Sequence, residues 1–169
     1  MLFKNFILKF NWRFCLIHFL AIYCIMYAFN TFASIAYTDL VTAYFSKGKE
    51  DITSLQDLSN FLITIDIATF VGLLIAFIIS LVMATRKKIW WSNSLLIFII
   101  AFSLHRFDFF GWQYVKYIFI YILGWIDNLA LYYTICGTLL LSLALLLMFS
   151  KTTNRFIAST NKPFISPVP

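Results

Sequence analysis

Four ionisable side chains near the ends of long apolar segments could carry chemistry in this sequence: Asp66, His105, Arg106 and Asp127. An ionisable group in an apolar, membrane-like segment is a candidate for function because its desolvation has a cost. In a catalytic hypothesis, Asp66 would act as acid or base, and Arg106 or His105 would orient an anionic group. We expect any enzymatic activity of the chain to reside at these residues.

Each candidate also has a structural explanation. Asp127 or Asn128 precedes an apolar run and could cap the first turn of a helix. Arg106 could neutralise Asp66 across two helices, and Arg106 with Asp108 could lie among lipid headgroups. Asp66 is one turn inside its segment and can still reach water. Structural and catalytic roles for Asp66 therefore both stay open.

The histidines and cysteines do not form a recognisable cofactor site. His18 and His105 are expected at opposite membrane faces, so they cannot together ligate a haem. We expect His18 to be neutral, packed and hydrogen-bonded to a neighbouring helix. The three cysteines, all inside apolar segments, are expected to be packing residues: Cys15, Cys24 and Cys136. No zinc, phosphate-loop or Ser/His/Asp motif occurs, so we predict no metal and no cofactor.

Composition decides the class of protein. The 169 residues are 62% hydrophobic and 12% charged, with a mean hydropathy of +0.88. This is too little polar surface for a soluble enzyme, a disulfide scaffold or a disordered tail. The net charge is +6, but the charged residues lie between apolar runs and do not form one basic face. The charge therefore does not indicate nucleic-acid binding. An integral membrane protein in contact with the lipid bilayer is predicted.

Apolar length predicts an all-α fold, a bundle of four transmembrane helices. The predicted spans are about 14–36, 61–84, 89–105 and 129–149. We place them in one membrane domain, residues 1–150. Residues 151–169 hold all three prolines and are expected to form a cytoplasmic tail without a further helix.

The charges orient these spans. Nine of the thirteen basic residues and none of the seven acids flank one side of the predicted bundle. By the positive-inside rule, both termini are predicted to be cytoplasmic. On the outer side, Ser54 and Asp57 form a capping-box pattern. The second helix is therefore expected to begin at Leu55 and to project beyond the membrane.

An aromatic segment, residues 107–126, lies between the third and fourth spans. If it crossed the bilayer, Lys116 would lie near mid-depth and the basic tail would move outside, against the charge pattern. We favour an interfacial or re-entrant helix on the outer side, and five spans is the alternative.

Small residues recur at every fourth position in two spans. The second span carries Thr64, Ala68, Gly72, Ala76, Ser80 and Ala84, and we predict a helix-packing seam at Ala68, Gly72, Ala76 and Ser80. The fourth span repeats the pattern at Ala130, Thr134, Thr138 and Ser142. A seam within the chain is the favoured interpretation of these patterns, and an oligomer or partner interface is the alternative.

The sequence favours a non-catalytic subunit, scaffold or assembly factor of a larger membrane complex, with membrane proteins as partners. An outline of four spans with outward acidic residues resembles the lipoprotein signal peptidases, which implies a hydrolase-like enzyme as the alternative. Their GNxxDR-like and FNxAD-like motifs do not occur here. A small proton-coupled transporter is a third hypothesis. We predict the inner membrane of a bacterium, with an organellar inner membrane as the alternative.

Overall fold

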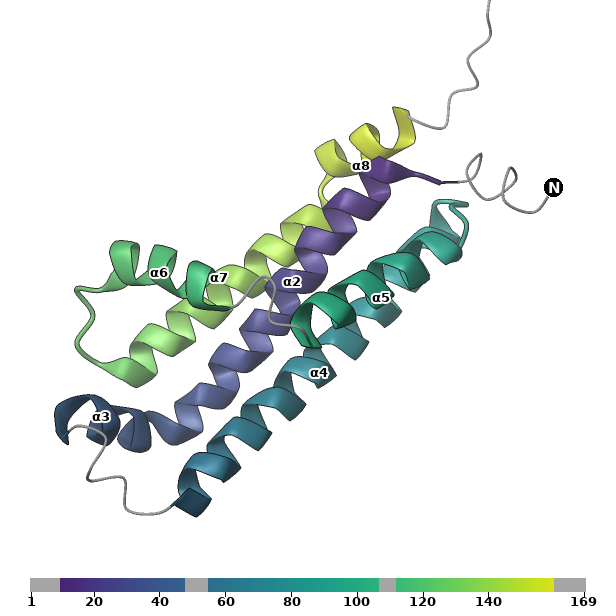
Figure 1. Cartoon of the computed structure of the whole chain (residues 1–169). Coiled ribbons are helices and arrows are strands. Elements are labelled where there is room, and N and C mark those ends of the chain that lie inside the picture. The colour runs from purple at the N-terminus through teal and green to yellow at the C-terminus, as the bar shows by residue number, and fades with distance from the viewer. Residues whose placement is uncertain (1–9, 48–54, 107–111, 160–169) are drawn as a thin grey trace, which may run out of the picture.

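The computed structural model describes residues 10–47, 55–106 and 112–159, of which nine-tenths are helical and none is in a strand. The helical elements in chain order are α2 (Trp12–Ser34), η1 (Ile35–Tyr37), α3 (Thr38–Lys47), α4 (Leu55–Arg86), α5 (Ser92–Arg106), α6 (Trp112–Leu123), α7 (Leu129–Phe149) and α8 (Lys151–Ala158) (Figure 1). The predicted all-α class is confirmed.

Three helical stretches of the described chain are long and apolar enough to cross a membrane: Trp12–Ala43, Gln56–Arg86 and Leu129–Phe149. The first is longer than predicted, because η1 and α3 continue the helical path of α2 as far as Lys47. The helix that contains the second stretch, α4, begins at Leu55, as the sequence predicted. The proposed capping residue Ser54 lies outside the described residues. The third has the predicted bounds.

The predicted third span is the exception. Its helix, α5, begins at Ser92 and not at residue 89, and it has 15 residues. At 1.5 Å per residue it is about 22 Å long, which is shorter than a hydrocarbon core of about 30 Å. The predicted span is too long because Ile89 and Trp90, although apolar, belong to the turn that follows α4.

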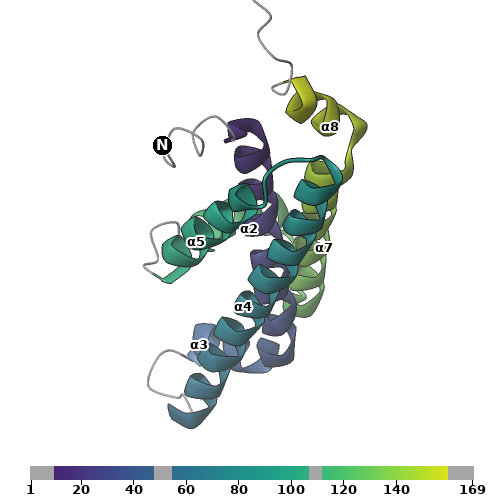
Figure 2. The ribbon, with the colours of Figure 1, turned by 90° about the vertical axis from the view of Figure 1, so that its right-hand side faces the viewer.

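The central helix of the fold is α2. It packs against α4, α5 and α7, and α4 also packs against α5 (Figures 1 and 2). Two glycines permit close approach to α2. A Cβ on Gly72 of α4 would lie 3.0 Å from the Phe29 side chain, and a Cβ on Gly137 of α7 would lie 2.6 Å from the Phe32 ring. These glycines let the two long helices pack closely against α2.

The turn after α4 brings the chain back into α5. Lys88 has a φ of 55°, in the left-handed region, and its N–H donates to the Thr85 carbonyl at 3.1 Å. The Ile89 N–H donates to the Ala84 carbonyl at 2.9 Å, and both of these residues are buried. This pairing is a Schellman motif, which ends a helix and reverses the chain.

The segment after α7 corrects a second prediction. Residues 151–158 form α8, whereas no further helix was expected there. The Ser150 hydroxyl caps α8 by accepting the Thr153 N–H at 3.1 Å, and Ile157 is buried in the core. Proline excludes a helix only near itself, and the three prolines follow α8, outside the described residues.

Helix α6 occupies most of the predicted aromatic segment, of which residues 107–111 lie outside the described part of the chain. It lies beside α7 (Figure 1). Phe119 packs against a small cluster formed by Tyr27, Ala28 and Leu140. Leu140 lies three turns into α7, so this contact brings α6 to the middle of that helix, whereas Ile118, Tyr121 and Ile122 of α6 are exposed.

Candidate functional site

The best-defined ionic contact of the candidate residues joins α4 and α5. His105 Nε2 lies 3.3 Å from Asp66 Oδ1, a distance at the long end for a hydrogen bond. The Asp66 side chain is 65% exposed and that of His105 is 23% exposed. The pair is therefore open to solvent or to headgroups, and its charge attraction depends on protonation of the imidazole.

Two neutral hydrogen bonds lie on the same part of α4. The buried Asn30 donates from Nδ2 to Thr69 Oγ1 at 3.0 Å, which ties α2 to α4. The hydroxyls of Tyr37 and Thr64 lie 2.9 Å apart and join η1 to α4. These two contacts fix α4 against α2 on either side of Asp66 along the helix.

The structure does not gather all the outer polar residues into one site. Within the described chain, no hydrogen bond or ion pair joins Arg106 or Asp127 to the Asp66–His105 pair. Arg106 was considered as the ion-pair partner of Asp66. In the structure, the neighbouring residue His105 contacts Asp66 instead. Asp108 lies outside the described residues.

The capping explanation for the start of α7 is confirmed at Asn128. Its side chain accepts the Leu131 N–H at 2.9 Å, and its backbone is extended, as N-cap residues require. Asp127, one residue earlier, is exposed. Helix capping therefore explains the presence of Asn128 without a catalytic role.

His18 corrects a further prediction. It is fully buried and stacks on Phe14, with ring centroids 3.9 Å apart, as a packed histidine should. However, neither ring nitrogen has a hydrogen-bond partner among the described residues, whereas a bond to a neighbouring helix was expected. Sequence position alone could place His18 inside the span, but it could not identify what its ring would face.

Sequence reasoning missed one buried polar cluster, where α2 begins and α5 begins. Asn93 Oδ1 accepts the Asn11 N–H at 3.0 Å, and the Cys15 thiol lies 3.5 Å from the same oxygen. At the next residue of α5, the buried Ser94 hydroxyl accepts a hydrogen bond from the buried Ser80 hydroxyl of α4 at 3.2 Å. The available signal was Ser92–Asn93–Ser94, three consecutive polar residues inside an otherwise apolar run.

The two stripes of small residues have different surroundings. On α4, Gly72, Ala76 and Ser80 are buried, and Ala68 is half-buried. On α7, the stripe is exposed at Thr134, Thr138 and Ser142. Thr134 and Thr138 donate their hydroxyls to carbonyls one turn earlier in α7, at 2.8 and 2.7 Å. The α4 stripe thus lies inside the chain, and the α7 stripe faces outward.

The Asp66–His105 pair could exchange a proton with a bound group, which is the chemistry of a general acid or base. Within the described chain, neither member forms a hydrogen bond with a hydroxyl or thiol, and no cluster of metal-binding side chains occurs. No protein-family model matches the chain, and neither a curated protein nor a solved structure shows a significant match to it.

Proposed function

We propose that the protein is a non-catalytic subunit, scaffold or assembly factor of a larger complex in the inner membrane of a bacterium. The outward stripe of α7, Thr134, Thr138 and Ser142, supports this proposal. Small side chains let helix backbones approach closely, which favours association in lipid. Because no helix of the described chain covers this stripe, a helix of a partner can pack there.

The topology belongs to the same proposal. The starts of α2 and α5, the ends of α4 and α7, and α8 lie at one end of the molecule (Figure 1). We place this basic end in the cytoplasm, with four spans, both termini inside and α6 as a re-entrant helix on the outer side. In this arrangement the short α5 is the third span, and the basic turn that precedes it lies at headgroup level.

Affinity purification in mild detergent at native expression level tests the proposal. The wild type is expected to retain a membrane partner at constant stoichiometry. Thr138→Leu should release it, because a large side chain on the stripe separates the helices. Leu139→Phe changes the next residue, which is 49% exposed, and should keep the partner. A monomer or homo-oligomer without a partner in the wild type contradicts the subunit proposal.

The Asp66–His105 pair favours a second candidate, a membrane enzyme with an outward-facing polar site. In an enzyme of this kind, Asp66→Asn would accumulate as folded protein and fail to complement a deletion. Asp39→Asn, an exposed change on α3, is the matched control. Under the subunit proposal, Asp66→Asn complements as well as Asp39→Asn does, so the same comparison separates the two functions.

A further inference from the structure

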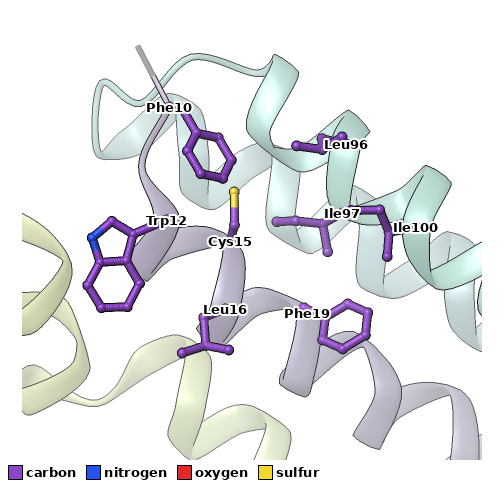
Figure 3. A pocket seen from close by; sticks show the side chains of 8 residues that line it. All are labelled: Phe10, Trp12, Cys15, Leu16, Phe19, Leu96, Ile97 and Ile100. Atoms are coloured by element: carbon purple, nitrogen blue, oxygen red, sulfur yellow. The ribbon is translucent and has the colours of Figure 1, made fainter. Parts of the chain in front are cut away.

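An apolar groove of about 390 Å³ lies between the first half of α2 and α5 (Figure 3). Its lining includes Phe10, Leu16, Phe19, Leu96, Ile97 and Ile100. Leu16 is 49% exposed and Ile100 is 42% exposed, so the groove opens to the outside of the molecule. Its volume is within the range of ligand pockets, and its chemistry suits a hydrocarbon chain.

One end of the groove lies beside the turn between α4 and α5. The bond from the Asn11 N–H to Asn93 Oδ1 holds the start of α2 against the start of α5. Trp90 and Trp91, which precede α5, are 42% and 54% exposed. Exposed tryptophans favour the level of lipid headgroups. The groove therefore runs from headgroup level into the depth at which acyl chains lie.

The charge at this end is uniformly positive in the described chain. Six basic residues lie there: Arg13, Arg86, Lys87, Lys88, Lys151 and Arg155. The described acids lie toward the opposite end, in α3, in the first half of α4 and before α7: Asp39, Asp57, Asp66 and Asp127. A basic surface at headgroup level attracts anionic lipids.

Among the basic residues of the turn, Lys88 has an unfavourable backbone conformation. Its φ of 55° is a conformation in which glycine is the usual residue. The side chain is exposed, so core packing does not require a lysine there. Because Lys88 belongs to the turn that leads into α5, its exposed ammonium is available to a phosphate at this end of the groove.

From these observations we infer that the chain holds an anionic phospholipid, with one acyl chain in the α2–α5 groove and its phosphate at Lys88. Charge complementarity selects an anionic lipid over a zwitterionic one, and the groove selects a lipid over a soluble phosphate. The site is distinct from the α7 stripe, and it does not depend on the proposed subunit function.

Native mass spectrometry of the full chain in mild detergent tests the site with dioleoyl phosphatidylglycerol and dioleoyl phosphatidylcholine. The wild type should retain phosphatidylglycerol preferentially, and glycerol phosphate without acyl chains should not compete. Lys88→Asn keeps a residue that tolerates the left-handed backbone, and it should weaken phosphatidylglycerol retention by about a factor of five. Lys151→Asn removes an exposed charge from the same end and should change retention by less than a factor of two.

Two leucines of α2 test the groove. Leu16→Trp fills it and should lower the retention of both lipids, whereas Leu20→Trp, one turn later and 45% exposed, should not. Ile100→Trp fills the groove from α5 if Leu16→Trp does not accumulate. Equal retention of the two lipids by the wild type, or equal behaviour of Leu16→Trp and Leu20→Trp, overturns the inference.

Discussion

At the scale of single residues, Lys87 has the least favourable surroundings of the charged groups at the basic end. Its Nζ is shielded from solvent and has no hydrogen-bond partner among the described residues. Burial lowers the pKa of this ammonium below its usual value of 10.5. The buried His18 is close enough for the two groups to repel each other if both were protonated. Lys87 therefore destabilises the fold while it is charged.

Lys87→Met is expected to raise the melting temperature at pH 7. The unfolded chain keeps the ordinary pKa, so between the lowered pKa of the folded chain and pH 10.5 it binds more protons at this site than the folded chain does. The stability of the wild type therefore rises with pH through this range, and the difference in melting temperature between the variant and the wild type becomes smaller. Melting curves from pH 7 to 10.5 measure it, with the exposed Lys151→Met as control. A difference that does not change with pH would argue against burial as the cause.

Asp66→Asn tests how much the Asp66–His105 contact stabilises the fold. Because Asp66 is 65% exposed, we expect a loss of less than about 1 kcal/mol in the free energy of unfolding. Reversible unfolding in mixed detergent micelles measures this value, and His105→Gln should give a similar one. A loss of several kcal/mol would assign the pair to the structural framework of the helices.

At the scale of elements, two residues, Arg13 and Ile157, hold α8 against the rest of the molecule. The Arg13 guanidinium donates to the Phe156 carbonyl at 3.1 Å and to the Ser159 hydroxyl, and it lies 4.5 Å from the centre of the Phe156 ring. Ile157 adds a buried apolar anchor. The amphipathic α8 thus covers the basic end of the central helix.

Arg13→Leu is expected to loosen α8 while the long helices stay folded. It removes both hydrogen bonds and the cation–π contact, leaving Ile157 as the main anchor. Amide hydrogen exchange at residues 153–158 should accelerate by at least about tenfold, if roughly 1.4 kcal/mol of local stability is lost. Arg155→Leu, an exposed change on α8 itself, is the control. Equal exchange in the two variants would show that Arg13 does not hold α8.

Gly72 determines how closely α4 approaches α2. A Cβ at this position would lie 3.0 Å from the Phe29 side chain and 3.2 Å from the Ile25 carbonyl oxygen. Gly72→Leu should therefore lower the free energy of unfolding by about 3 kcal/mol or more, since the helices must separate. Val71→Leu, at a position 39% exposed, should have little effect. Thermal unfolding followed by circular dichroism compares them; equal melting temperatures would contradict a close helix contact.

At the scale of the whole molecule, the charge asymmetry predicts which end faces the cytoplasm. Single cysteines can be placed at Lys88, Ser159, Asp57 and Tyr121, after Cys15, Cys24 and Cys136 are replaced by serine or alanine. In intact cells, an impermeant maleimide should label positions 57 and 121 and leave positions 88 and 159 unlabelled. Permeabilised cells control for reactivity. Labelling of all four positions, or of position 159 alone, would contradict the proposed orientation.

The sequence by itself determined the features that depend on local composition and on residues next to one another. Apolar length predicted α7 with its bounds, the Ser54–Asp57 pattern predicted the start of α4 at Leu55, and the polar residues before α7 predicted the Asn128 cap. Helix formation and capping involve residues within one turn of each other, so both can be predicted from residues that are close in the sequence. Prediction failed locally where turn geometry mattered, at the start of α5, and where Ser150 begins α8 ahead of the prolines.

Only the tertiary structure decided which residues meet. His105 and not Arg106 faces Asp66, although the two are adjacent in the chain, because a step of one residue turns a helix by about 100°. The stripe on α4 is buried and the similar one on α7 faces outward, because α7 turns a different face, which includes Gly137, Leu140 and Ala144, into the bundle. The rotation and position of a helix depend on all the side chains that it packs against. The spacing of residues within one helix therefore cannot predict them.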